Sequence, residues 1–293
     1  MSYLYLDHNI YIYALQNSSI QEKINMLKGA GIQCVYSPAH IEEIHTAMVG
    51  KPGEYTQTAT ELFLLISNFT DNLECLPSPT KIIVKSESPT ECYDRVKQVD
   101  TTHRVRKDSE VKFGFDHEHY QRMVQSDKHN QSISTLSCEQ IWCHPDIAQI
   151  INNFNQNIEH VIRKHNSSMD TLLCAAMGVD KSLPKSYRLE QGGFETLRNS
   201  HTELEYTIEV LFRILNQYGY QSEKTLAKTI SGTHDTSHAI YATAAKWLLT
   251  TDTRFFAKCN AVYSFLKVPT KVVLCKAESI VESLDCIATD RTT

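Results

Sequence analysis

The chain has 293 residues, of which 41% are hydrophobic and 22% are charged, so it can bury a sizeable core and is not a disordered polymer. Lys and Arg together number 29 and Asp and Glu number 34, which gives a formal net charge of −5. This acidic balance excludes a protein that coats nucleic acid by bulk positive charge, although it leaves open local phosphate contacts through metal ions or a small basic patch.

The apolar segments are too short and too often interrupted to cross a membrane. Residues 3–15 contain Asp7 and lack a basic flank, which is unlike a secretory signal, and residues 239–249 contain Lys246. No stretch reaches the roughly 18 apolar residues of a membrane span. The nine cysteines have no CxxC spacing, which argues against a secreted disulfide scaffold. We therefore expect a cytoplasmic protein with reduced thiols.

The first part of the chain alternates short apolar runs with apolar residues at helical spacing. The run Tyr3 to Leu6 predicts a buried strand that ends at Asp7. Ser37 and Pro38 predict the start of a helix, because Ser is a favoured N-cap and the first turn does not use the N–H that Pro lacks. In chain order we expect a strand at 3–6, helices at 10–14 and 20–28, a strand at 33–36, helices at 38–48 and 56–69, and a strand at 73–76.

The last part of the chain repeats this alternation. Apolar spacing predicts a helix at 233–245, a strand at 247–250, a helix at 253–266 and a strand at 271–274. Strands that alternate with helices predict an α/β fold with a mostly parallel central sheet, covered by helices on both faces.

The middle of the chain has a different pattern. Residues 147–162 and 194–215 carry apolar side chains at helical spacing, whereas residues 101–138 are polar and predict a loop or lid. We expect no strand from about residue 85 onward in this part. The predicted organisation is a discontinuous α/β core, residues 1–84 and 222–293, interrupted by a mainly helical insertion, residues 85–221, that binds a substrate or a partner.

Acidic residues follow two of the predicted strands and lie on two of the predicted helices. Asp7 and Asp252 come directly after strands, Glu42 and Glu43 lie on the helix that follows a third strand, and Asp235 lies in a first helical turn. The carboxyl ends of parallel strands are where function gathers in such folds. Carboxylates that converge there repel one another unless a cation holds them together, and Mg2+ or Mn2+ is the cation that takes oxygen ligands.

Several of these residues also fit a structural role. Asp7 is a favoured N-cap for the helix that follows it, and an Asp in the position of Asp235 favours the helix dipole. His238 lies three residues after Asp235 on the same helix face, where it either contacts phosphate or is a satisfied, partly buried histidine. Glu42 and Glu43 point about 100° apart, and we select Glu43 for the site because it precedes an inward-facing Ile.

Four segments combine these acids with neighbouring aliphatic and polar residues in a recurring way. They are YLDHNIYI (5–12), SPAHIEEI (37–44), HDTSHAIYA (234–242) and LLTTDTRF (248–255). In this order they resemble the motifs of the PIN-domain nucleases: a strand followed by Asp-x-Asn, a Glu before an aliphatic residue on a helix, Asp-x-x-x-Ala-x-x-Ala, and Thr-x-Asp-x-x-Phe. The resemblance covers residues 1–84 and 222–290.

The resemblance implies a central parallel sheet and an acidic divalent-metal site that hydrolyses RNA phosphodiesters to a 5′-phosphate and a 3′-hydroxyl. By position, it makes Asp7, Glu43, Asp235 and Asp252 both the catalytic residues and the metal ligands, with Mg2+ or Mn2+ as cofactor. It makes Asn9 and Thr251 polar supports beside them. This chain departs from the family in the 192 positions that separate Glu43 from Asp235, a gap that the helical insertion fills.

The partners expected from this interpretation are nucleic acid and regulatory protein. RNA is the expected substrate, with DNA left open, and the basic cluster Arg104, Arg106 and Lys107 is the candidate contact to its backbone, although a solvated loop is the default for such a cluster. A toxin or antiviral effector, regulated by a protein partner or by homo-oligomerisation, is the setting that the resemblance implies.

Two other functions fit parts of the pattern. A PIN-like fold can serve as a non-catalytic scaffold, although such proteins usually lack the acids that are present here. A haloacid-dehalogenase-type phosphatase also begins with a strand and an Asp, but it needs a second Asp two residues later as proton donor. This chain has Asn9 there, which cannot donate that proton, so the phosphatase ranks lowest.

Overall fold

The computed structural model describes residues 2–50, 53, 55–78, 80–98, 133–221 and 233–290. Its centre is a four-stranded, fully parallel sheet, so the expected α/β class is confirmed at that level. The strands lie in the order β2-β1-β5-β6, in which Tyr5 is the register partner of both Val35 and Leu248. Their bounds are β1 (Ser2–Leu6), β2 (Ile32–Val35), β5 (Trp247–Thr250) and β6 (Lys271–Leu274).

An antiparallel hairpin extends this sheet beyond β2. It consists of β3 (Leu73–Pro77) and β4 (Ile82–Ser86). Tyr36, directly after β2, donates its N–H to the carbonyl of Leu73 at 3.0 Å and accepts from the N–H of Cys75 at 2.7 Å. β4 was not predicted, because its apolar run is short and leads at once into polar residues.

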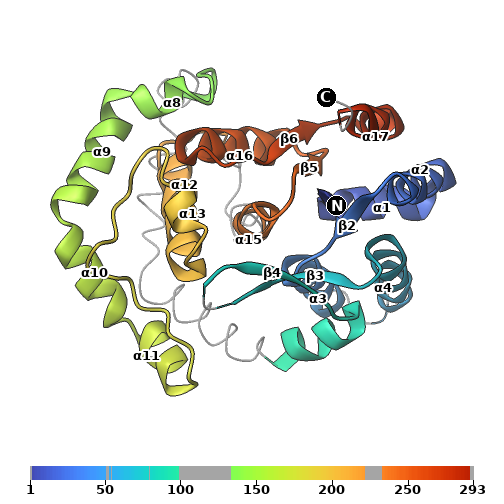
Figure 1. Cartoon of the computed structure of the whole chain (residues 1–293), viewed down its shortest axis with the longest axis horizontal. Helices are drawn as coiled ribbons and strands as arrows, with labels where there is room; N and C mark the ends of the chain where they lie inside the picture. Colours follow the sequence, from blue (N-terminus) through green and yellow to red (C-terminus); the bar gives the residue numbers. More distant parts are fainter. Residues whose placement is uncertain are drawn as a thin grey trace.

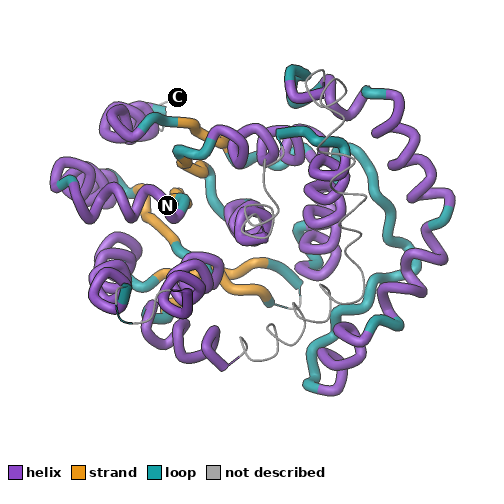
Figure 2. The backbone as a smooth tube through the Cα atoms, turned by 180° about the vertical axis from the view of Figure 1, so that it is seen from behind, coloured by secondary structure: helices purple, strands orange, loops and turns teal. Residues whose placement is uncertain are grey.

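Helices cover both faces of the parallel sheet, as Figures 1 and 2 show. Leu4, Leu6 and Leu249 pack on one side into a core shared with several helices, and Tyr5 and Leu248 pack on the other side into a second core. This alternation follows from the strand period of two. The helices of the first core include α1 (His8–Gln16), α2 (Ser18–Gly29), α4 (Thr56–Thr70) and α17 (Ile280–Thr289), of which α17 was not predicted.

The second core is built by helices from distant parts of the chain. Leu204, Ile208 and Leu211 of α13 (His201–Gln217) pack into the same core as Ala239 of α15 (Thr233–Ala242) and Val262 of α16 (Thr253–Leu266). The helix predicted at 253–266 therefore has the expected bounds, whereas the helix predicted to reach residue 245 ends at Ala242. The insertion thus contributes α13 directly to the packing of the α/β core.

The helices of the insertion between residues 140 and 176 form an arc around α13 (Figure 1). The indole N–H of Trp142 donates to the carbonyl of Ala261 at 2.7 Å, which attaches the arc to α16. The helix expected over 147–162 is two helices separated at Asn157. The arc and its return consist of α8 (Gln140–Cys143), α9 (Pro145–Gln156), α10 (Ile158–Asn166), α11 (Met169–Ala176) and α12 (Phe194–Leu197).

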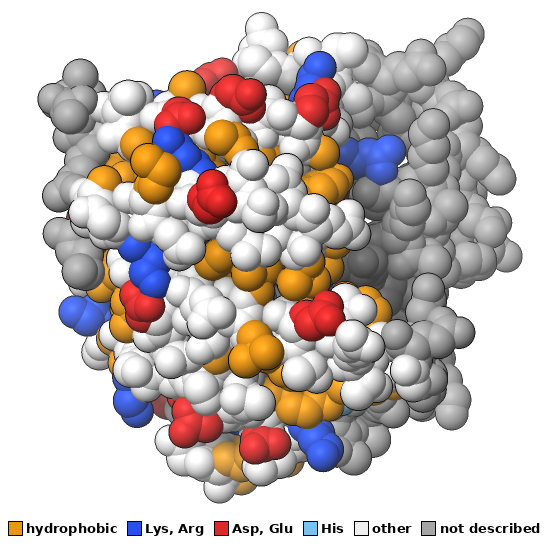
Figure 3. All heavy atoms as spheres, turned by 90° about the vertical axis from the view of Figure 1, so that its right-hand side faces the viewer, with side chains coloured by type: hydrophobic (Ala, Val, Ile, Leu, Met, Phe, Trp, Pro, Cys, Tyr) orange, Lys and Arg blue, Asp and Glu red, His pale blue; other side chains and the backbone are white. Residues whose placement is uncertain are grey.

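The face made by α2, α4 and α17 carries acidic and basic side chains side by side (Figure 3). Lys23 of α2 pairs with Asp285 of α17, and Lys28 pairs with Asp71 at the end of α4 at 2.5 Å. Paired charges of both signs are typical of a solvated surface. No helix in the described part of the chain is long and apolar enough to cross a membrane.

Candidate functional site

The parallel sheet brings the ends of three strands to one edge. Asp7 follows β1, Asp252 follows β5, and α3 (Pro38–Gly50), which carries Glu43, follows β2. Helix α15 leads back to the start of β5, so its first turn, with Asp235, lies at the same edge. The four predicted acids therefore come from four elements that meet at the carboxyl edge of the sheet, where ligand sites form in such folds.

Asp7 is the most buried of these acids, with 6% of its surface exposed. Its Oδ1 accepts the N–H of His8 at 2.8 Å, and its Oδ2 accepts the hydroxyl of Thr250 at 2.7 Å. The same hydroxyl oxygen accepts the N–H of Asp252 at 3.0 Å. Thr250 thus links the two acids at the ends of β1 and β5, a role that the sequence analysis had assigned to Thr251.

Asp252 is the N-cap of α16. Its Oδ1 accepts the N–H groups of Arg254 at 2.7 Å and Phe255 at 2.9 Å, which are donors that the first helical turn leaves unpaired. Asp7 likewise caps α1 through the N–H of His8. Asp7 and Asp252 therefore both cap a helix and lie at the acidic edge. Capping occupies one of the two carboxylate oxygens of Asp252.

The acids act on one another electrostatically. Burial, followed by the charges of Glu43 and Asp252, raises the pKa of Asp7 to about 7, and the bonds from Thr250 and His8 partly offset this rise. Burial, followed by the charge of Asp7, raises the pKa of Asp235 well above its ordinary value. A group of carboxylates with such raised pKa values is a site at which a bound cation would lower the electrostatic free energy.

One buried cation opposes this repulsion. Lys258 of α16 is 5% exposed, and its ammonium lowers the pKa of Asp235. Sequence reasoning missed it, although a signal was present. Lys258 lies between Phe255, Cys259 and Val262 on the inward face of a helix, where a lysine needs an acidic partner.

Buried histidines form a second group beside the acids. The N–H of Ser37 donates to His40 Nδ1 at 3.1 Å, so His40 carries its proton on Nε2 and donates it to the carbonyl of Leu6 at 2.7 Å. The hydroxyl of Tyr5 lies 2.7 Å from His238 Nδ1 and 2.5 Å from Ser37 Oγ. These bonds hold both imidazoles in place beneath the acidic edge.

Glu43 lies between two imidazoles. Its Oε2 is 3.5 Å from His8 Nδ1, and its Oε1 is 3.6 Å from His238 Nε2. Glu42, by contrast, is 40% exposed and lies 3.8 Å from His234. The structure thus turns Glu43 toward the site, as expected, and adds His8 and His40, which the sequence analysis did not single out.

The donor set fits a divalent cation in its chemistry. Carboxylate oxygens are what Mg2+ and Mn2+ prefer, and the repulsion among these acids is what such an ion would relieve. As the side chains stand, however, no group of three or more His, Cys, Asp or Glu among the described residues could hold a metal ion. Binding would therefore require side-chain rotation at this edge.

The other predicted site residues either do not take part in the contacts among these acids and histidines or lie outside the described residues. Asn9 is exposed on α1, and Thr251 is half-buried after β5. Arg104, Arg106 and Lys107, and most of the expected loop or lid, lie outside the described residues. The predicted contact between the basic cluster and nucleic acid therefore stays a prediction.

Thr250→Val should lower the free energy of unfolding by about 2 kcal/mol, because it removes a donor to buried Asp7 and an acceptor for the N–H of Asp252. Thr251→Val is the matched control one residue later, and we expect it to change stability by less than about 0.5 kcal/mol. Urea unfolding of the three proteins measures both values. Equal stability of the two variants would show that the Thr250 hydroxyl has no special role.

Comparison of this chain with protein-family models, with curated proteins and with solved structures gave no match.

Proposed function

We propose that this chain is a divalent-metal-dependent ribonuclease of the PIN-like type, which hydrolyses RNA phosphodiesters at the site formed by Asp7, Glu43, Asp235 and Asp252. One observation carries the proposal. Four carboxylates come from four elements at the carboxyl edge of a parallel sheet, and the charges of Asp7, Glu43 and Asp252 all raise the pKa of Asp235. The four motifs that resemble the PIN-domain nucleases contain these same residues.

The energetic argument concerns the cost of gathering the acids. Asp7 and Asp235 are ionised in water near neutral pH, but burial and mutual repulsion favour their protonated forms in the fold. A scaffold would gain nothing from this arrangement. A divalent ion held by these carboxylates would restore their ionised forms, and when bound it would lower the pKa of a water and offset charge on a phosphodiester.

The chain's own groups would orient the acids for this task. Thr250 holds Oδ2 of Asp7, and the backbone of α16 holds Oδ1 of Asp252. Lys258 favours the ionised form of Asp235. Three of the four acids thus receive a bond or a favourable charge from outside the acidic group, which is the kind of support that preorganised metal and substrate sites require.

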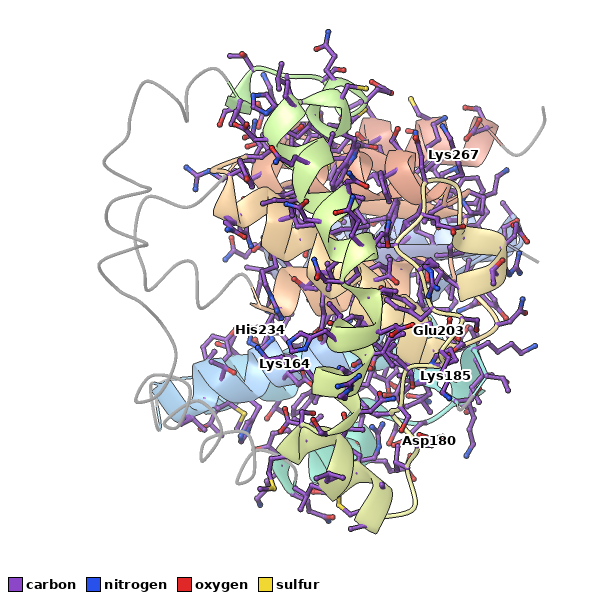
Figure 4. All side chains as sticks on the ribbon, turned by 90° about the vertical axis from the view of Figure 1, so that its left-hand side faces the viewer. Lys164, Asp180, Lys185, Glu203, His234 and Lys267 are labelled. Atoms are coloured by element: carbon purple, nitrogen blue, oxygen red, sulfur yellow. The ribbon has the colours of Figure 1, made fainter. Side chains whose placement is uncertain are left out.

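RNA as the substrate rests on the resemblance together with the placement of charge on the insertion. The last turn of α10 carries Arg163, Lys164 and His165. Figure 4 looks onto the insertion and labels Lys164 on α10. Basic side chains of this kind contact the nucleic-acid backbone without reading sequence. A toxin or antiviral effector remains the setting that this activity would suit.

Cleavage of RNA by the purified chain should depend on Mg2+ or Mn2+ and stop when EDTA removes them. The products should carry a 5′-phosphate and a 3′-hydroxyl, which ligation without prior end repair detects. Asp252→Asn should reduce the rate by about a hundredfold or more, because Asn keeps the N-cap of α16 but loses the charge. The exposed Asp94→Asn is the control variant and should cut as wild type does.

The alternatives give different results in the same experiment. A non-catalytic scaffold would bind neither ion at near-millimolar concentration and would cut no RNA. A phosphatase of the haloacid-dehalogenase type would form an aspartyl-phosphate on Asp7 when given a phosphate monoester. Cleavage of single-stranded DNA at a rate equal to that of RNA would leave the chemistry in place and correct the substrate.

A further inference from the structure

Glu43 is approached from both sides by imidazoles that belong to two other helices. His8 of α1 places Nδ1 3.5 Å from Glu43 Oε2, and His238 of α15 places Nε2 3.6 Å from Glu43 Oε1. Well-formed N–H···O bonds are about 2.7–3.2 Å long, so neither contact is a good hydrogen bond. Three elements therefore bring two nitrogens and a carboxylate together without pairing them.

Both nitrogens are buried and lack a hydrogen-bond partner within the described residues. His238 is 1% exposed, and the side chain of His8 is 13% exposed. A buried polar atom without a partner costs about 1–3 kcal/mol. Two such nitrogens face the same carboxylate, and a ligand bound between them would remove the free-energy cost of leaving them without a partner.

The chain holds His238 in the way that ligating histidines are usually held. Its other ring nitrogen, Nδ1, lies 2.7 Å from the hydroxyl of Tyr5, which is in turn 2.5 Å from Ser37 Oγ. Metal-ligating histidines generally have such a bond on the nitrogen opposite the metal.

The separations are close to those of ligands that share an ion. With metal–ligand bonds of about 2.1 Å, two neighbouring ligand atoms lie roughly 3.0–3.4 Å apart. The observed 3.5 and 3.6 Å exceed this range only slightly. Because no three side chains in the described residues already surround an ion, closing the site requires rotation of the Glu43 carboxylate toward the two rings.

We propose that His8, Glu43 and His238 bind a borderline transition-metal ion of the series from Mn2+ to Zn2+ in preference to Mg2+. Imidazole nitrogen suits the later ions of this series, such as Fe2+, Ni2+ and Zn2+, whereas Mg2+ prefers oxygen ligands and retained waters. The proposal deepens the proposed function by naming the class of metal at the same edge of the sheet, and it rests on that function only for what the ion does to RNA. Binding itself does not depend on cleavage.

The test measures metal binding by the full-length chain after treatment with EDTA. Titration with Co2+, followed by visible absorption, gives affinity, and pulsed electron paramagnetic resonance of the Mn2+-loaded protein detects coupling to imidazole nitrogen directly. His238→Asn keeps a polar atom near the Nδ1 position for Tyr5 and removes Nε2. His8→Gln places its amide near the Nε2 position and removes Nδ1. The exposed His160→Gln on α10 is the control.

We expect nitrogen coupling in the wild type, and we expect each site variant to bind Co2+ about tenfold or more weakly, with little change in Mg2+ affinity. The control should bind as wild type does. Absence of nitrogen coupling in the wild-type protein would overturn the proposal whatever the variants do, and so would unchanged Co2+ affinity in both site variants.

The outcomes also separate this inference from the ribonuclease proposal. Nitrogen-coupled Mn2+ without any RNA cleavage would support the metal site and remove the nuclease. Mg2+-dependent cleavage that is lost in Asp252→Asn but kept in His8→Gln, without nitrogen coupling, would do the opposite. The wild-type resonance measurement does not depend on the folding of any variant, so it decides the metal site even where a variant fails to fold.

Discussion

Asp7→Asn should abolish RNA cleavage and, in the same protein, stabilise the metal-free fold at pH 8. The loss of cleavage, about a thousandfold, follows from removing the charge that lies deepest in the site. The gain in stability follows from burial and the neighbouring charge of Glu43, which together raise the pKa of Asp7 from 3.8 to about 7. Ionisation of Asp7 at pH 8 therefore costs up to about 4 kcal/mol in the fold.

The pH dependence has a definite sign. Asp7 binds its proton more tightly in the folded state than in the unfolded state, because its pKa is raised on folding. This difference does not penalise the fold at low pH, where both states carry the proton, but it destabilises the fold progressively as the pH rises from 3.8 to about 7. Asn cannot ionise and gives up at most one hydrogen bond to Thr250, worth about 1 kcal/mol. In EDTA, the variant should thus be about 3 kcal/mol more stable than wild type at pH 8, with a much smaller difference at pH 4.

Thermal unfolding in EDTA, with and without added Mn2+ or Mg2+, measures this prediction. The ion should raise the melting temperature of wild type, because it binds only the folded state, and should leave that of Asp7→Asn nearly unchanged. The exposed Asp94→Asn serves as the control at each pH. A variant that is less stable than wild type in EDTA at pH 8 would show that Asp7 serves the fold and not a cation.

Those parts of the fold that depend on local pattern were predictable from the sequence. The strands at 247–250 and 271–274 and the helix at 253–266 have the predicted bounds, because apolar runs and the Asp N-cap mark them locally. β4 depends instead on its partner β3, since its side chains are only half-buried and its short apolar run is not decisive. The break at Asn157 likewise has no Gly or Pro to signal it.

The residues of the candidate site likewise divide into those that local sequence pattern indicates and those that only the tertiary structure brings together. Asp7 and Asp252 were found because they follow recognisable strands, and Glu43 was chosen over Glu42 from the inward face of its helix. Thr250 was missed because its contact with Asp7 depends on the register in which Leu6 pairs with Leu249, and single residues do not reveal register. The contacts of His8 and His238 with Glu43 join three elements and could come only from the tertiary structure.

Arg95→Met should be the most destabilising substitution away from the candidate site. Glu74 on β3 is fully buried, and both of its carboxylate oxygens accept from Arg95 Nη2, at 2.9 and 3.1 Å. The same guanidinium contacts Glu87 at 3.1 Å, so it joins the hairpin to the segment that follows β4. Removing one partner of a buried pair typically costs 3–5 kcal/mol, and because Arg95 is 41% exposed we expect about 3.

The loss should depend on pH, because the buried carboxylate that remains can escape its cost by binding a proton. Burial already raises the pKa of Glu74, and loss of the Arg95 charge raises it further. The destabilisation should therefore be full at pH 8 and shrink as the pH falls through 4.5, below which Glu74 carries a proton in both the folded and the unfolded state. Glu74→Gln combined with Arg95→Met should recover part of the loss at pH 8, since it removes the unpaired charge. Urea unfolding of the single and double variants at both pH values measures these free energies. If Arg95→Met loses the same stability at the two pH values, the cause is lost packing of the Arg95 side chain and not the buried charge of Glu74.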